Sequence, residues 1–195
     1  MLEVEHAMHG LLTAQFNKKG IKMKSIDELL QKHAKAQEVN GYTSTDVIEF
    51  LKKSLNIHWQ QTTVLTAQSV HFERWGYKKL ADMLKQDSEE EHEHAKVNIK
   101  RLEFFDQDYQ PITISPPIWR RHDIVAMIQY NLNSVREAAA TERATITAAR
   151  SVGDEITANM MIPLLQGSEN GIELYESYLK MIDEMGLDNF LTLQV

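Results

Sequence analysis

Residues 75–95, WGYKKLADMLKQDSEEEHEHA, hold the features that decide the fold of this chain. After the opening WGY, the sequence reads as one long helix without glycine or proline up to about residue 105. Leu80 and Leu84 are four residues apart and begin an apolar stripe along one face of that helix. Glu91 and His94 continue the same face through its middle. The stretch therefore predicts a core-facing helix that carries ionisable groups where apolar ones are expected.

Similar helical patterns lie on both sides of this stretch. The chain has 195 residues but only 8 glycines and 4 prolines, and strand-like alternation is short everywhere. The chain is therefore predicted to be all-α. Helices are expected at about 43–76, 78–105, 122–150 and 153–185. Each has close to 30 residues, or roughly 40–45 Å at 1.5 Å per residue, and such similar lengths favour a four-helix bundle.

The connection between the second and third helices decides the topology. It runs from Asp106 to Arg121 and contains PITISPP at residues 111–117, which favours an extended backbone. About 16 residues at roughly 3.3 Å each reach across the whole bundle. We therefore expect two helical hairpins joined by one long crossover between helices 2 and 3.

Further segments are expected at the two ends of the bundle. Residues 1–42 read as an N-terminal extension with a short amphipathic helix that begins at the capping box Ser25–Glu28. Residues 43–195 form the bundle domain. Gly186 is predicted to end the fourth helix, and the tail that follows it forms a short C-terminal fifth helix. The basic stretch 17–24 is interpreted as a solvated loop rather than a DNA contact.

Composition excludes several classes of function. The chain has no cysteine, so thiolate zinc sites, iron–sulfur clusters and cysteine nucleophiles are excluded. A formal net charge of −7 argues against a general nucleic-acid binder. No apolar run approaches the roughly 20 residues of a membrane span. The N-terminal MLEVEHAMHG lacks the layout of a signal peptide, so a cytoplasmic location is expected.

His58, Glu91 and His94 are the candidate metal ligands. Glu91 and His94 are one turn apart, and His58 lies at mid-height of the preceding helix. Ionisable groups inside a bundle need a partner, a hydrogen bond or a metal. Two interpretations stay open at this point: a His₂Glu site for one Fe²⁺ or Zn²⁺, and a metal-free network in which a charged histidine pairs with Glu91.

The chain resembles bacterioferritins from about Val47 to Val195. The resemblance rests on WGYKKLADMLKQDSEEEHEHA, on NMMIPLL at residues 159–165 and on IDEMGLDNFLTLQ at residues 182–194. It implies a ferritin-like four-helix bundle that self-associates into a hollow shell of 24 subunits. It also implies storage of iron as a mineral, oxidation of Fe²⁺ at a di-iron centre inside each bundle, and haem bound between paired subunits.

The resemblance carries over only part of that di-iron centre. Glu91 and His94 match the family's glutamate and histidine of the second helix, and His58 stands at the position of the first-helix glutamate. The remaining three ligand positions hold Val135, Ser168 and Gly171. We therefore predict reduced or absent di-iron ferroxidase activity, which leaves open whether the protein is an enzyme.

Neighbouring glutamates do not replace the missing ligands in this interpretation. Glu137 and Glu169 point to other sides of their helices, and Glu142 lies about 10 Å along the axis from Val135. No histidine follows His122. The second iron subsite is therefore predicted to be absent.

His92 is a candidate haem ligand, because it falls where the family carries its haem-binding methionine and points about 100° away from Glu91. Three functions stay open. The first is an iron-storage or iron-handling shell subunit, alone or beside a related active subunit. The second is a mononuclear His₂Glu metal-binding protein or enzyme. The third is a non-catalytic structural subunit that partners another protein.

Overall fold

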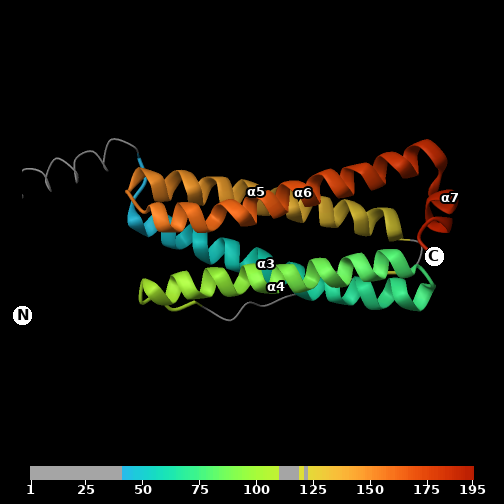
Figure 1. Cartoon of the computed structure of the whole chain (residues 1–195), viewed down its shortest axis with the longest axis horizontal. Helices are drawn as coiled ribbons and strands as arrows, with labels where there is room; N and C mark the ends of the chain where they lie inside the picture. Colours follow the sequence, from blue (N-terminus) through green and yellow to red (C-terminus); the bar gives the residue numbers. More distant parts are fainter. Residues whose placement is uncertain (1–40, 110–118, 121–122) are drawn as a thin grey trace, which may run out of the picture. The chain divides into compact units, whose positions relative to one another are not determined.

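The structure is a computed structural model and describes residues 41–109, 119–120 and 123–195. Within these ranges the regular structure is entirely helical, as predicted. The elements are α3 (Ser44–Trp75), α4 (Lys78–Phe104), α5 (Ile124–Ser151), α6 (Glu155–Met185) and α7 (Leu187–Thr192) (Figure 1). The amphipathic helix expected in residues 1–42 lies outside the described residues, and Tyr42–Val195 forms one compact unit.

Local sequence signals fix the ends of the first hairpin. At the start of α3, Thr43 and Asp46 form a capping box, in which the Asp46 carboxylate accepts from the Thr43 backbone N–H at 2.7 Å. Gly76 ends α3 with a φ of 89°, a left-handed conformation that costs glycine little. The chain then turns directly into α4. Predicted and observed helix boundaries agree within two residues here.

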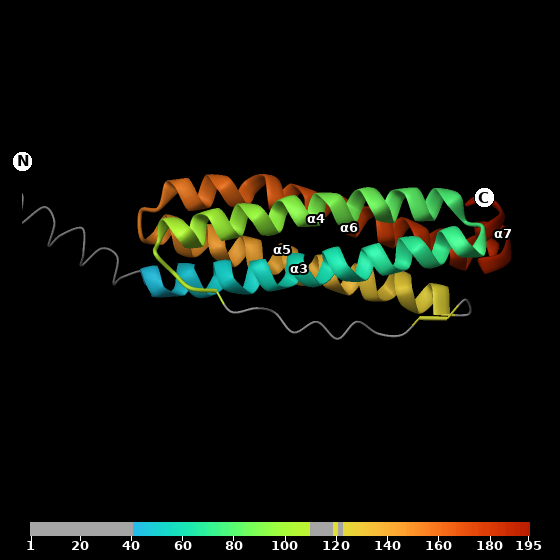
Figure 2. The same ribbon diagram turned by 90° about the horizontal axis from the view of Figure 1, so that it is seen from below.

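The four long helices form two antiparallel hairpins, α3 with α4 and α5 with α6 (Figure 1). α4 and α5 run in the same direction, so the chain between them joins opposite ends of the bundle (Figure 2). The predicted long crossover is therefore confirmed. The short α7 follows Gly186 and packs on the bundle end through Phe190, which is fully buried.

Pro163 lies inside α6, where proline removes a backbone hydrogen bond and favours a kink. The helix nevertheless continues across it from Glu155 to Met185. None of the helices in the described part of the chain is both long and apolar enough to cross a membrane.

Apolar side chains form two separate clusters along the bundle. One includes Leu65, Leu84, Val135 and Tyr175, and the other includes Leu55, Ala95, Ile146 and Leu164. On every long helix there is a gap between the last member of one cluster and the first member of the other. The buried polar residues His58 and Glu142 fall into this gap on α3 and α5. The interior of the bundle is thus divided by a polar layer at mid-height.

Candidate metal centre

The three predicted ligands come from the first hairpin, and the structure brings them together in the polar layer. His58 projects from α3, and Glu91 and His94 project from consecutive turns of α4. Backbone carbonyls beside both imidazoles are satisfied: the Thr62 hydroxyl donates to the carbonyl of His58 at 2.9 Å, and the Asn98 amide donates to that of His94 at 3.0 Å. Both histidines lie inside their helices, well away from the helix ends.

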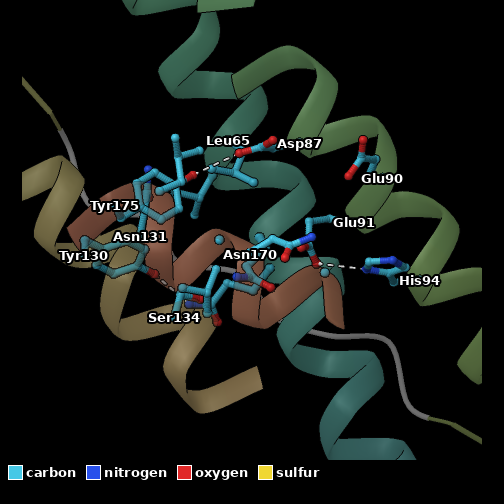
Figure 3. Close-up of a pocket in the computed structure, with 17 residues that line it drawn as sticks. Leu65, Asp87, Glu90, Glu91, His94, Tyr130, Asn131, Ser134, Asn170 and Tyr175 are labelled. Atoms are coloured by element: carbon cyan, nitrogen blue, oxygen red, sulfur yellow. Dashed lines mark hydrogen bonds and ion pairs between the residues drawn. The ribbon is translucent and has the colours of Figure 1, made fainter. Parts of the chain in front are cut away.

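Distances among the three side chains suit a shared ion. Nδ1 of His58 lies 2.5 Å from Oε2 of Glu91, and Nδ1 of His94 lies 4.0 Å from the same oxygen. The two imidazole rings meet edge to face with centroids 5.1 Å apart. One ligand atom from each residue lies within 4.8 Å of the others. Figure 3 shows Glu91 and His94 directed toward one another from α4.

Glu142 of α5 also contacts this cluster, although the sequence predicted only that it does not replace the ligand at Val135. Its Oε1 lies 3.2 Å from Nε2 of His58, on the side of the ring away from Glu91. The contact is an ion pair without the alignment of a hydrogen bond. Both side chains are 0% exposed. A fully buried carboxylate without a cationic partner destabilises the folded state, so the charge of His58 is needed to stabilise Glu142.

The two histidines differ in protonation. Burial by itself lowers the pKa of His58, but the contacts with Glu142 and then Glu91 outweigh it and raise the pKa to about 9. His58 is therefore a cation at neutral pH when no metal competes for its nitrogen. For His94, burial is the largest effect and lowers the pKa, with Glu91 opposing it. Its imidazole is neutral and keeps a lone pair for a ligand.

These side chains fit a divalent ion. Nδ1 of His94 is buried and has no hydrogen-bond partner within the described structure. A buried polar atom in that state is costly, and an ion beside Glu91 would satisfy it. Two imidazoles and one carboxylate form a donor set used for both Fe²⁺ and Zn²⁺. The cluster can therefore act as a metal-free ion-pair network or as a metal site.

A cavity of about 150 Å³ opens beside the cluster and is large enough for several water molecules. Glu91 and His94 of α4 line it on one side, and Asp87 of α4 and Tyr175 of α6 line it as well (Figure 3). The Tyr175 hydroxyl donates to Asp87 at 3.1 Å. Burial, partly opposed by that hydrogen bond, raises the pKa of Asp87 to about 6. Open coordination positions of an ion at Glu91 and His94 would face this cavity.

The side of the bundle formed by α5 and α6 offers apolar or small residues at the family's other ligand positions. Val135 and Ser168 are both buried. A β-carbon built on Gly171 would lie only 3.2 Å from Cγ1 of Val135, so the two helices are in close contact there. One turn earlier, a β-carbon on Gly167 would lie 3.3 Å from Cε1 of His94. The small residues on α6 thus make room for Val135 and for the imidazole.

Two glutamates considered as replacements lie on the surface. Glu137 pairs with Lys53 at 3.2 Å, and Glu169 pairs with Arg143. Each carboxylate is about half exposed. Both therefore point away from the cluster, as their helical positions predicted.

The candidate haem ligand lies apart from the cluster. His92 is exposed on α4 and stacks on the indole of Trp59, with ring centroids 5.3 Å apart and an interplanar angle of 20°. This outward position agrees with the predicted direction of the side chain. Haem ligation by His92 stays a prediction.

Comparisons with known proteins agree with the fold. A model of the ferritin-like domain family matches residues 48–185. A bacterioferritin of Brucella melitensis biotype 1 is 25% identical over 116 residues, which cover 60% of this chain and 71% of that protein. A bacterial ferritin of Synechocystis is 23% identical over 125 residues, with coverage of 64% and 80%. A bacterioferritin of Rhodobacter capsulatus is 26% identical over 150 residues, with coverage of 75% and 91%.

Proposed function

The chain belongs to the ferritin-like family and is similar to bacterioferritins, and we propose that it is an iron-storage or iron-handling subunit that binds one iron ion per chain. The ion would be held by His58, Glu91 and His94. Oxidation of Fe²⁺ at a di-iron centre would be reduced or absent.

The observation that carries this proposal is the asymmetry of the polar layer. Three donor atoms from α3 and α4 lie within 4.8 Å of one another. On the opposite side, Val135 and Gly171 are in close contact and leave no ligand at two of the family's positions. Chemistry at a pair of metal ions depends on ligands that hold both of them. The donor set supports one ion far better than two.

Anaerobic titration with Fe²⁺ tests the binding of one ion. We expect saturation near one ion per chain in the full-length protein. The substitutions His94→Ala and Glu91→Gln are each expected to abolish saturable binding. His71→Ala is the matched histidine control, because His71 lies near the far end of α3 and stacks on Trp75. Saturation near two ions, or unchanged binding in His94→Ala, would contradict the proposal.

Stopped-flow measurement of iron oxidation tests the second half of the proposal. When oxygen is mixed with the protein loaded with Fe²⁺, we expect no fast phase whose amplitude saturates at two ions per chain. A bacterioferritin with a complete di-iron centre serves as the positive control. A fast two-ion phase would show that the opposite side of the bundle supplies ligands after all.

Self-association into a shell is also proposed, because two of the similar proteins are bacterioferritins. Several large apolar side chains of the described unit stay exposed, among them Val70, Phe104 and Ile156. Such side chains are suited to contacts between subunits. Analytical ultracentrifugation distinguishes a particle of about 24 chains from a dimer. Co-expression with a related ferritin that keeps all its ligands tests for a mixed shell.

The cavity beside Glu91 and His94 supports one alternative, a mononuclear metal enzyme or metal-binding protein. A site with two histidines and one carboxylate leaves coordination positions for a small molecule, and the 150 Å³ cavity provides space for one. Small particles with one tightly bound ion would favour this alternative. Absence of metal after purification in iron-rich medium, together with no shell, would favour a structural role.

A further inference from the structure

We infer that Glu142 is a positioning residue for the metal site: it holds the imidazole of His58 with Nε2–H toward α5, so that Nδ1 presents its lone pair to the ion. This inference deepens the proposed function and rests on it. It assigns a role to a residue that contributes no ligand atom.

The geometry places the two carboxylates on opposite edges of one ring. Glu91 approaches Nδ1 of His58 at 2.5 Å, and Glu142 approaches Nε2 at 3.2 Å. The imidazole thereby connects α3 to α4 on one side and to α5 on the other. The Glu91 oxygen beside Nδ1 of His58 also lies 4.0 Å from Nδ1 of His94.

The chemistry of a neutral imidazole then selects the ligand atom. One ring nitrogen carries hydrogen and the other carries a lone pair. A carboxylate only accepts, so each carboxylate favours hydrogen on the nitrogen that it faces, Glu91 on Nδ1 and Glu142 on Nε2. An ion bound to Glu91 would take the place of the hydrogen on Nδ1, and Glu142 would then favour the tautomer with hydrogen on Nε2. The lone pair is left on Nδ1, where Glu91 and His94 complete the donor set. Histidines that bind metals commonly have their other N–H directed at a carboxylate.

Glu142 has no competing role in the described structure. Both of its carboxylate oxygens are buried without a hydrogen-bond partner, and its side chain is fully enclosed. His58 is the cationic group recorded beside it. Charge also balances, because a divalent ion together with the carboxylates of Glu91 and Glu142 is neutral overall. A buried site of zero net charge avoids the cost of an uncompensated ion.

Zn²⁺ is a suitable probe, because it binds the same donor types and does not react with oxygen. Zn²⁺ affinity is measured by competition with a chelating dye for the full-length wild type, Glu142→Gln and Glu142→Leu. The control is Glu137→Gln, which changes an exposed glutamate on the same helix. Circular dichroism verifies that each variant is folded. Crystals soaked in Zn²⁺ identify, from the anomalous signal, which nitrogen of His58 binds the ion.

We expect Nδ1 of His58 to bind Zn²⁺ in the wild type. Affinity should fall about 10- to 100-fold in Glu142→Leu. It should fall less in Glu142→Gln, whose amide oxygen still presents a partial negative charge to Nε2–H, and should not change in Glu137→Gln. Binding through Nε2, or both Glu142 variants within twofold of the wild type, overturns the role of Glu142 and leaves the proposed ion site standing. No Zn²⁺ or Fe²⁺ binding in the wild type overturns both.

Discussion

A β-carbon on Gly171 of α6 would stand 3.2 Å from the Cγ1 methyl of Val135 on α5. Contacts this short require a neighbour to move, so the substitution Gly171→His alone is expected to destabilise the protein by about 1–3 kcal/mol through overpacking. The combination of Val135→Glu, Ser168→Glu and Gly171→His removes the obstructing methyl and restores three family ligand positions. Anaerobic titration of this triple variant should then saturate near two Fe²⁺ per chain. Saturation at one ion would mean that restoring these three side chains is not sufficient to create a second iron site.

The ion pair between His58 and Glu142 predicts strong coupling between the two residues in unfolding. His58→Leu leaves a buried carboxylate without a cation and should cost about 3–5 kcal/mol of unfolding free energy. The double variant with Glu142→Leu should recover most of that loss, because apolar pairs of similar size often replace buried ion pairs without cost. Urea unfolding of the metal-free protein measures both. Lys53→Ala, which breaks a surface pair with Glu137, is the control and should cost about 0–1 kcal/mol.

The raised pKa of His58 predicts how stability depends on pH. Its pKa in the folded protein is about 9, above the ordinary value of 6.5, so the folded state binds the proton more tightly than the unfolded state. The stabilising contribution of His58 is complete below about pH 6.5 and is lost as the pH rises through 9. The unfolding free energy of the metal-free wild type should therefore fall relative to that of the double leucine variant across this interval. A constant difference from pH 6 to 9.5 would show that the histidine does not hold the extra proton.

Gly167 predicts an effect on metal affinity that is separate from stability. A β-carbon there would lie 3.3 Å from Cε1 of His94, so Gly167→Ala should displace the imidazole by a few tenths of an ångström. Replacing a glycine within α6 by alanine also stabilises the helix by up to about 1 kcal/mol. We expect Zn²⁺ affinity to fall while the melting temperature changes little. Gly171→Ala is the matched control, because its new methyl would meet Val135 rather than His94.

Haem binding by His92 is predicted to give a Soret band when the protein is expressed with haem available. The exposed imidazole has to leave its stack on Trp59 or bring haem against it. His92→Ala should abolish the band, and His71→Ala should not. Purified wild type that takes up no haem would refute the prediction.

The fold could be predicted almost completely because its signals are local. Thr43 and Asp46 cap α3, Gly76 ends it, and Gly186 ends α6. The direction of the crossover followed from the length of the connection alone. His58, Glu91 and His94 were found because ionisable residues interrupt an apolar stripe.

Glu142 was missed, although the same criterion applies to it. Its neighbours on that face of α5, Ala138 and Ile146, are buried and apolar. Glu142 lies seven residues from Val135, too far along α5 to replace a ligand at that position, and that spacing carries no information about His58. Its contact with His58 depends on the axial position of α5 relative to α3. The periodicity of a single helix does not specify that position.

All three proposed donor atoms belong to one hairpin, formed by residues 44–104 of the chain. Contacts between segments close in sequence form early, because little chain entropy is lost in closing the loop between them. During synthesis the donors can therefore meet while residues 124–185 are still inside or near the ribosome. An ion captured by the nascent hairpin would be enclosed only later, when the second hairpin arrives and brings Glu142 to the far edge of the imidazole.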